Sequence, residues 1–506
     1  MQIQNLPSGG GQRPVFCRGD GAAAMSKTAG KAELGGRKVE FGLGVLVVKK
    51  SLFRTAVAVS FLLLSAVTSA YSQATDGNIV GNIIDSTGSA IPDAKVEAEN
   101  IATGVKTQVT ADGAGFYHAD NLLVGAYKLS VNAPGFAPAA VENIAVTLNL
   151  STTVNVTLSV ATVSSTVQVT EAGALIDTTT AQLTNSYAAQ SVQDLPSTVN
   201  PNGGVLNLSL LGAGVTSNGG VGVGTGPAIA GQRPRNNSFN IEGVDNNRKD
   251  VTGPVASVPP ETVAEFTIIQ NQFSAEYGHS TGGQFNTVLV NGTNQIHGTI
   301  WEYLQNRNLN AIDQAFARQY VGQTLPPNPR FDENRLGAMI GGPIKKNKLF
   351  YFGSWEYTPI GQNSIPSSAS YSPTSAGYSL LAGIPSVSQT LLGVLKQYAA
   401  PAPVASGSTV VGGVTIPIGI LPIVAPNFSN EYRWIVSVDY SLSSNDQLHG
   451  RYIDNKTSAI DTLANLPIFY TPQPTTSHVG SFSEFHNFSP SVVNEFRAAY
   501  KRSDIW

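Results

Sequence analysis

The chain has 506 residues, of which 42% are hydrophobic and 12% are charged, and its formal net charge is −3. This length is enough for more than one domain. The low charge content, together with 51 glycines and 29 prolines, favours a protein built from strands and turns over a helical one. The single cysteine, Cys17, excludes both a disulfide framework and a zinc site made of cysteines.

A targeting signal is predicted at residues 49–74. Basic residues precede an apolar run at 56–67, which is shorter than the ~20 residues that a membrane-spanning helix needs. Small residues follow, so cleavage after Ala74 or Ala70 fits a secretory signal peptide, with a buried core helix as the alternative. Residues 1–48 show no clear pattern and stay unassigned, as an over-extended start.

Export would leave an acidic chain. Removing residues 1–74 takes away nine basic and three acidic residues, which leaves 21 basic against 30 acidic residues and a net charge of −9. A chain of this charge is a poor binder of nucleic acid, so no nucleic-acid partner is expected.

Residues 77–160 contain short alternating runs separated by turn signals, which predicts a small β-sandwich of about seven strands. The residues expected to point inward are Ile79, Ile83, Val96, Val105, Val109, Phe116, Tyr127, Leu129 and Val131. The stretches "GSAIPDAKVEAENIATG", "TADGAGFY" and "LLVGAYKLSVNAPGF" resemble the carboxypeptidase-regulatory-like domains. That resemblance implies a transthyretin-like sandwich without catalytic residues, in a group of folds that can bind carbohydrate.

Residues 163–292 have a mixed, glycine-rich texture. The glycine run near 219–225 lacks the spacing of a phosphate-binding loop and no helical pattern follows it. At the end of this region, "GGQFNTVLVNGTNQIHGTIWEYLQN" has two apolar runs around Asn291-Gly292, which locally predicts a β-hairpin.

The region from 295 to 506 has the pattern of a transmembrane β-barrel. Seven candidate strands of about ten residues are joined by connections that are alternately long and short, as in an antiparallel barrel with tight turns at one end. A soluble β-domain with one wet face would not explain this alternation. The candidate strands are 296–305, 332–341, 348–357, 431–440, 446–455, 477–487 and 491–501.

Side chains alternate along these strands. Tyr432, Trp434, Val436, Val438 and Tyr440 share one face, while Arg433, Ser437 and Asp439 share the other and Ile435 departs from the pattern. Seven strands are an odd number, whereas single-chain bacterial barrels have an even one, so we expect the N-terminal part of a longer protein. The alternative is that Trp506 is the aromatic C-terminus that outer-membrane assembly recognises.

Three segments together resemble the TonB-dependent outer-membrane transporters, in the Oar-like branch that carries a carboxypeptidase-regulatory-like domain. They are "RPRNNSFNIEGVDNN" (233–247), "AEYGHSTGGQFNTVLVNGTNQIHGTIWEYLQN" (275–306) and "RFDENRLGAMIGGPIKKNKLFYFGSWEY" (330–357). The resemblance implies a mainly β chain with a periplasmic sandwich, a mixed α+β plug at 163–292 and a partial barrel at 295–506. Asn291-Gly292 then becomes the seam between plug and barrel.

The resemblance further implies uptake of a siderophore, saccharide or peptide-like nutrient across the outer membrane, energised by a periplasmic TonB-type protein. The candidate coupling segment is Thr166, Val167, Gln168, Val169 and Thr170 within residues 164–173, with a last sandwich strand or a linker as the other interpretation. Candidate plug-loop residues are Arg233, Arg235 and Asp245, and candidate membrane-interface aromatics are Trp301, Tyr303, Trp355, Tyr357 and Trp434. A structural pairing of Arg233 and Arg235 with lumenal carboxylates is the favoured interpretation of those arginines.

No enzyme is expected. The six histidines are scattered without an HExxH motif, no GxSxG motif occurs, and the "DNNRKD" loop lacks the closing glutamate of a calcium loop. No cofactor or metal is therefore predicted. The function from a different class is a structural or adhesive outer-membrane protein whose sandwich binds carbohydrate or matrix. Deleting 164–173 separates the two functions, since only transport needs a coupling segment.

Overall fold

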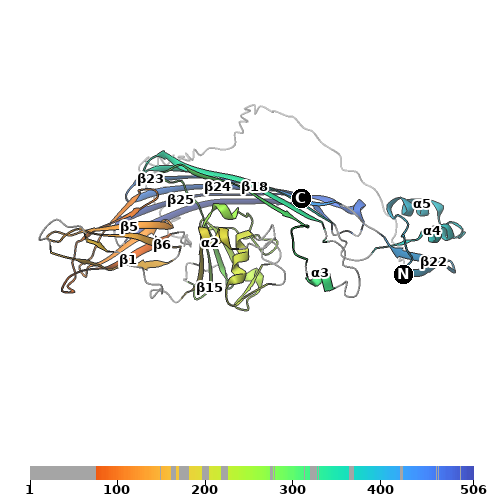
Figure 1. Ribbon diagram of the computed structural model, residues 1–506, viewed down its shortest axis with the longest axis horizontal. Helices are drawn as coiled ribbons and strands as arrows, with labels where there is room; N and C mark the ends of the chain where they lie inside the picture. Colours follow the sequence, from red (N-terminus) through yellow and green to blue (C-terminus); the bar gives the residue numbers. More distant parts are fainter. Residues whose placement is uncertain are drawn as a thin grey trace, which may run out of the picture. The chain divides into compact units, whose positions relative to one another are not determined.

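The computed structural model describes residues 76–505 except 149, 161–166, 170–181, 196–203, 218–225, 274–276, 278–279, 313, 319–327, 329, 364–369, 422–425, 463, 465 and 490–491 (Figure 1). The predicted signal peptide and the unassigned residues 1–48 lie outside the described residues. No described helix is both long and apolar enough to cross a membrane.

The first domain is a sandwich of two sheets, as predicted. One sheet holds β4 (Phe116–Leu122), β1 (Gly77–Asp85) and β7 (Ser151–Thr153), with β8 (Val156–Leu158) also on β1. The other has the order β3 (Lys106–Thr110), β2 (Lys95–Asn100), β5 (Gly125–Asn132), β6 (Ala139–Val146) and β9 (Val167–Val169). The strands therefore number nine, because short pieces at 151–169 extend both sheets.

The sandwich core contains most of the residues that alternation predicts. Seven of the nine expected inward residues are buried and Val105 is half-buried. The prediction for Phe116 is wrong, because that ring is exposed and its neighbour Tyr117 is buried instead. Tyr117 can lie inside because its hydroxyl donates a 2.6 Å hydrogen bond to the carbonyl of Val154, which satisfies the polar end of the ring.

The second domain is built on a mixed five-stranded sheet, here called the plug sheet. Its order is β10 (Leu183–Ala188), β15 (Val263–Asn271), β16 (Gln284–Leu289), β13 (Ser238–Ile241) and β14 (Val244–Asp245), and only β13 and β16 run parallel. Around it lie α2 (Ala189–Asp194), η1 (Gly204–Leu211), η2 (Pro234–Asn236), η3 (Pro260–Thr262) and the pair β11 (Val215–Thr216) and β12 (Ala228–Ile229). Strands with short helices agree with the predicted α+β plug.

The third domain is an antiparallel meander of seven strands, here called the wall sheet. Its strands are β17 (His297–Asn306), β18 (Phe331–Lys345), β19 (Leu349–Asn363), β23 (Pro426–Ser443), β24 (Asp446–Asp461), β25 (Thr471–Ser489) and β26 (Val492–Ile505), paired in sequence order. All seven predicted strands are confirmed. Six are longer than predicted, mostly at the long-loop end, because the strands continue beyond the apolar span that alternation detects.

The long connections carry structure that the sequence analysis treated as loop. Between β19 and β23 lie β20 (Tyr371–Pro373), α4 (Ser375–Ala382), α5 (Gln389–Tyr398), β21 (Gly407–Val411) and β22 (Val414–Ile420), with their own small apolar core. The other long connections contain α3 (Gln314–Arg318) and η5 (Pro467–Phe469).

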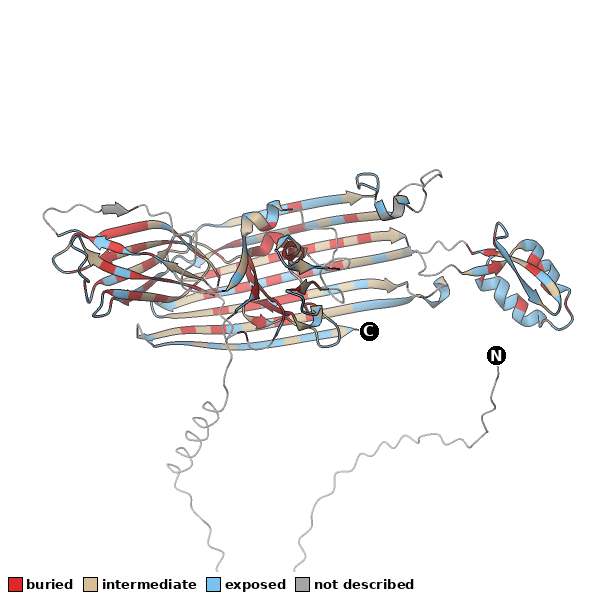
Figure 2. Cartoon of the chain, turned by 90° about the horizontal axis from the view of Figure 1, so that it is seen from below, coloured by how far each residue is buried: buried red, intermediate tan, exposed pale blue. Residues whose placement is uncertain are grey.

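The two faces of the wall sheet have different surroundings. Phe352, Ile435, Ile453 and Val479 join the hydrophobic core of the plug, and Ile435, Ile453 and Val479 are direct cross-strand neighbours. Tyr432, Trp434, Val436 and Val438 face away from the plug and are exposed, as a lipid-facing surface requires. Figure 2 shows buried and exposed positions alternating along these strands. Ile435 thus departs from the polar pattern because it packs against the plug.

The stretch around Asn291-Gly292 joins two sheets. β16 pairs with β15 and β13 in the plug sheet, whereas β17 pairs with β18 in the wall sheet, so the two arms do not form the predicted local hairpin and the chain passes here from one sheet to the other. The chain passes so close to the wall that a Cβ at Gly292 would lie 2.4 Å from the carbonyl oxygen of Tyr351.

We therefore expect Gly292→Ala to destabilise the protein by about 1–3 kcal/mol, because the added methyl group meets backbone that has no room to shift. Thermal unfolding of the detergent-solubilised protein measures the effect. Gly393→Ala is the matched control, since a Cβ there on α5 meets no atom within 4 Å and should be neutral or slightly stabilising. Equal effects of the two substitutions would contradict the close approach at the seam.

Candidate functional site

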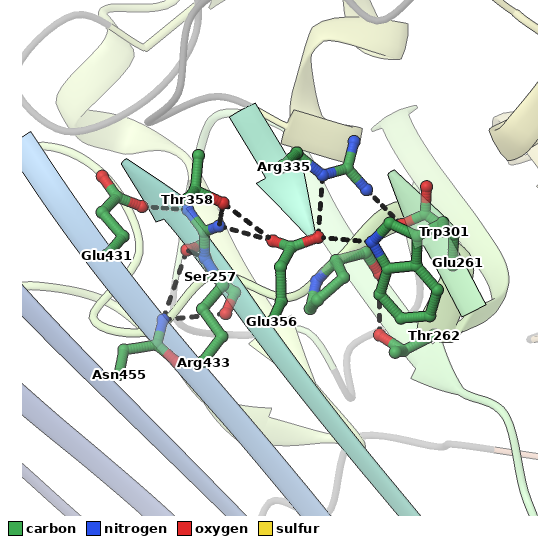
Figure 3. Close-up of polar contacts among 11 residues, drawn as sticks. Ser257, Glu261, Thr262, Trp301, Arg335, Glu356, Thr358, Glu431, Arg433 and Asn455 are labelled. Atoms are coloured by element: carbon green, nitrogen blue, oxygen red, sulfur yellow. Dashed lines mark hydrogen bonds and ion pairs between the residues drawn. The ribbon is translucent and has the colours of Figure 1, made fainter. Parts of the chain in front are cut away.

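Buried charges connect the plug to the wall sheet at Glu356 on β19 (Figure 3). Its Oε2 accepts hydrogen bonds from Arg335 Nε at 2.7 Å and from Trp301 Nε1 at 3.1 Å, and its Oε1 accepts one from Arg433 Nη1 at 2.7 Å. Arg335 also pairs with Glu261 of the plug, while Arg433 pairs with Glu431. Each guanidinium therefore has two carboxylate partners.

Two residues of the wall sheet also form hydrogen bonds to Ser257 of the plug. Arg433 Nε donates to Ser257 Oγ at 3.0 Å, and Asn455 on β24 donates to the carbonyl of Ser257 at 2.8 Å. Burial of a charge costs several kcal/mol unless the group is paired and hydrogen-bonded, and these pairs meet that condition. The plug is thus held by polar contacts that water could replace, in addition to the shared apolar core.

The position of the Trp301 indole depends on Gly337. Trp301 on β17 lies opposite Gly337 on β18, where a Cβ would come within 2.3 Å of the ring. A side chain at 337 would push the indole away from Glu356, so the ring and its hydrogen bond depend on this glycine.

A second cluster lies nearer the short turns. Arg451 on β24 pairs with Asp439 at 2.6 Å, and its other nitrogens lie 3.5 Å from Glu242 of the plug and 2.7 Å from Asn291 Oδ1. His449 Nδ1 lies 2.7 Å from Asp439. This cluster joins the wall, the β13–β14 turn and the seam, so it fixes the place where plug becomes barrel.

Glu265 connects the plug sheet to the sandwich. Its carboxylate on β15 accepts hydrogen bonds from the backbone N–H of Leu148 at 3.1 Å and from the hydroxyl of Ser186. Burial raises the pKa of the Glu265 carboxyl above its ordinary value of 4.5, although these hydrogen bonds draw the pKa in the opposite direction.

The plug also carries a polar cavity of about 400 Å³. Arg235, Arg248 and Lys249 lie around it together with the amides of Asn236, Asn237 and Asn247, and Thr252, Ser280 and Thr281 complete the polar lining. Arg248 is already paired with Asp250 at 2.6 Å, whereas no ion pair is found for Lys249 among the described residues. The cavity therefore presents positive charge and amide groups, which suit an anionic or polyhydroxy ligand.

The structure separates the three predicted plug-loop residues. Arg233 and Arg235 are exposed, and neither pairs with a carboxylate within the described residues, so their expected structural pairing is not found. Arg235 instead lines the cavity and donates to the carbonyl of Asp250 at 3.3 Å. Asp245 contacts the wall, where it pairs with Lys501 on β26.

The candidate coupling segment lies partly in the sandwich. Val167–Val169 is β9, which pairs in parallel with Ala139–Val141 of β6. This matches the alternative interpretation of a last sandwich strand and leaves the coupling role a proposal. Thr166 and Thr170 lie outside the described residues.

The five predicted interface aromatics divide between two faces. Trp355 lies opposite Trp434, and Tyr357 stacks on Tyr432 with ring centroids 4.5 Å apart, all on the face away from the plug. The prediction for Trp301 and Tyr303 is wrong, because Trp301 is buried at Glu356 and Tyr303 lies under the guanidinium of Arg335. On β17 the outward residues are Ile300 and Leu304, so apolar side chains occupy both faces and alternation does not distinguish them.

Two family models match the chain. Residues 288–506 match the model of an outer membrane beta barrel domain, and residues 78–159 match that of a carboxypeptidase regulatory-like domain. Over 314 residues the chain is 25% identical to the TonB-dependent transporter Oar of Myxococcus xanthus, which covers 61% of this chain and 29% of Oar. By sequence, the chain is similar to the TonB-dependent transporter Oar.

Two solved structures resemble part of this chain. The siderophore receptor PirA of Acinetobacter baumannii matches at 15% identity and a TM-score of 0.40 over 63% of this chain and 40% of PirA. The outer membrane transporter YddB of Escherichia coli matches at 11% identity and 0.43 over 63% of this chain and 38% of YddB. The chain spans less than half the length of each of these proteins. The relative Oar is a transporter and not an enzyme, in agreement with the sequence prediction.

We expect Glu356→Gln to destabilise the protein by about 3–5 kcal/mol, because two buried guanidinium groups lose the carboxylate that they share. Unfolding of the purified protein, followed by tryptophan fluorescence, measures the loss. Asp504→Asn is the matched control, since it breaks an exposed pair with Arg502 and should change stability by about 1 kcal/mol or less. A loss no larger than that of the control would show that Glu356 does not hold the site together.

Glu265→Gln tests the buried carboxyl by pH. A raised pKa in the folded state means that the contribution of Glu265 to stability is complete below its unfolded pKa and is lost as the pH rises. The melting temperature of the variant relative to the wild type should therefore increase from about pH 4 to about pH 7.5. Glu97→Gln should show the opposite trend, because hydrogen bonding to Lys106 lowers the pKa of Glu97. Parallel pH profiles of wild type and Glu265→Gln would contradict the assignment.

Proposed function

We propose that the chain is part of an outer-membrane transporter that takes up a small nutrient and is energised by a TonB-type periplasmic protein. The observation that carries the proposal is the plug, which contacts the wall sheet through charged and polar groups at Glu261, Ser257 and Glu242. The similarity to the transporter Oar supports it.

The character of the plug contact fits a part that moves. An interface sealed only by apolar side chains loses its stabilisation when it opens to water, whereas guanidinium and carboxylate groups become solvated. The contacts of Arg335, Arg433 and Arg451 can therefore be exchanged for water as the plug shifts. An interface of this kind is better suited to a plug that moves during transport than to a plug fixed in a purely structural barrel.

The cavity on the plug supports a ligand of anionic or polyhydroxy character. Its volume lies within the ~300–1,000 Å³ usual for small-molecule sites. Lys249 is exposed, and among the described residues Arg235 donates to one carbonyl, so both have donors for carboxylate, phosphate or hydroxamate oxygens. Siderophores, acidic saccharides and acidic peptides are the nutrient classes with this chemistry.

The place of β9 supports the proposed coupling segment. β9 is the last strand in the order of its sheet, so one of its edges has no neighbouring strand among the described residues. An open edge of this kind is what a partner uses when it pairs by strand addition. The TonB-type protein would thus extend the sandwich sheet at 167–169.

A reducible crosslink between plug and wall tests the function. Cysteines replace Ser257 and Asn455, which are hydrogen-bonded neighbours, and a short thiol crosslinker that contains a disulfide joins them in cells. Uptake of labelled ferric siderophores, acidic oligosaccharides and peptides is followed with and without a protonophore. If the plug moves during transport, crosslinking should abolish protonophore-sensitive uptake of the accepted substrate, and reduction should restore it.

The control joins two positions within the wall. Ser477 and Ser503 are register partners on β25 and β26, so a crosslink there leaves the plug free and should leave uptake unchanged. Retained uptake in the crosslinked plug variant would contradict the proposal. A protein that binds polysaccharide or matrix but imports no member of the panel would support the adhesive function instead.

A further inference from the structure

The outward face of β24 and β25 carries a group of three possible metal ligands near the short turns. Asp446 and His486 are direct cross-strand partners, and Glu484 lies two residues before His486 and therefore on the same face. One ligand atom from each of the three lies within 4.8 Å of the others. The group is distinct from the plug contacts, which lie on the opposite face of these strands.

The two carboxylates of the group are not neutralised by a basic side chain among the described residues. His486 Nδ1 lies 3.7 Å from Asp446 Oδ2, which is too long for a hydrogen bond. Asp446 Oδ1 is buried and accepts no hydrogen bond within the described residues. No lysine or arginine among the described residues forms an ion pair with Asp446 or Glu484. Two carboxylates thus lie beside a histidine without a lysine or arginine partner in the part of the chain that the structure describes.

Neighbouring residues hold the ligands in place. Asn494 on β26 donates a 3.3 Å hydrogen bond to Glu484 Oε2, and the ring of His486 packs on Phe488 with centroids 4.3 Å apart. The backbone positions are set by two adjacent strands, which form a rigid support for a site. The side chains of Asp446 and His486 are about one third exposed or less. Because Asp446 is the first residue of β24 and His486 lies opposite it, the group lies at the turn end of the strands, where an ion can enter from water.

We propose that Asp446, Glu484 and His486 bind a divalent first-row transition metal ion such as Zn²⁺. An imidazole nitrogen with two carboxylates suits such ions, whereas Ca²⁺ and Mg²⁺ prefer oxygen ligands alone. Ligand atoms about 2.0–2.1 Å from a tetrahedral ion lie about 3.4 Å apart, so the 3.7 Å His–Asp separation needs only a small side-chain adjustment. Water would fill the remaining positions.

The bound ion would fasten β24 to β25 close to the sandwich. Asn487, near the end of β25, accepts a 2.9 Å hydrogen bond from Asn121 of the sandwich. Binding to the folded state alone stabilises it, so the ion should raise the melting temperature. This site is independent of the proposed transport function.

A matched pair of histidines tests the site. The protein, purified in detergent and freed of metal with a chelator, is titrated with Zn²⁺, and bound metal is measured by equilibrium dialysis and mass spectrometry. His486→Gln and Glu484→Gln should each weaken Zn²⁺ binding at least tenfold. Loss of a group that only orients a metal ligand weakens binding about 10–100-fold, and loss of a ligand itself should cost at least as much. Binding should also weaken as the pH falls, because protons compete with the metal ion for its ligand atoms.

His478→Gln is the control. His478 is likewise paired with a cross-strand aspartate on the same face, Asp454 at 2.8 Å. Tyr452 contacts His478 and Lys456 pairs with Asp454, and His478 belongs to no group of three possible metal ligands among the described residues. This variant should bind Zn²⁺ like the wild type. Equal binding by wild type and His486→Gln, or equal affinity for Zn²⁺ and Ca²⁺, would overturn the proposal. Asp446→Asn gives a second test if His486→Gln fails to fold.

Discussion

The carboxylate of Glu356, held between the guanidinium groups of Arg335 and Arg433, is the interaction on which the contact between plug and wall depends. Three of its hydrogen-bond partners come from strands β17, β18 and β23, and one of them, Arg335, also pairs with Glu261 of the plug, so the group can form only when these elements are in place. The low dielectric of the site makes each pair strong when complete and costly when broken. A single orientation of the plug is specified in this way while the interface is closed to water, because a plug misplaced in the dry interface would leave buried charges without partners.

The alternation of side chains on the wall sheet follows from its two environments. One face meets lipid and carries Trp434 and Tyr432, while the other meets the plug and carries Arg433 and Ile435. A polar lumen would need only polar residues on this second face. The apolar row at Ile435, with its partners on β24 and β25, exists because part of the lumen is filled by protein and not by water.

The sequence was sufficient for the strands and insufficient for the site, for a physical reason. Alternation and loop length are local, so the seven strands and the seam at Asn291-Gly292 could be predicted. Glu261 and Arg335 are 74 residues apart, and Glu356 and Arg433 are 77 residues apart, so no local spacing relates them. The arginines on the inward face were the available signal, but their partners depend on strand register. Trp301 was expected near a membrane interface, but its face could not be assigned because β17 has large apolar residues on both faces, and only its pairing with Gly337 reveals which one is buried.

The contacts of the sandwich suggest how a force on it would be distributed. β9 is joined to β6 by parallel pairing, the chain continues from β6 to Leu148, and the N–H of Leu148 binds Glu265 on β15 of the plug sheet. Within each sheet many backbone hydrogen bonds act together, whereas Leu148–Glu265 and Ser257–Arg433 are individual polar contacts worth about 1–3 kcal/mol each. A load applied at β9 would therefore separate domains at these contacts before it unravels a sheet. The elements would move as units, and the plug would leave the wall with its own sheet intact.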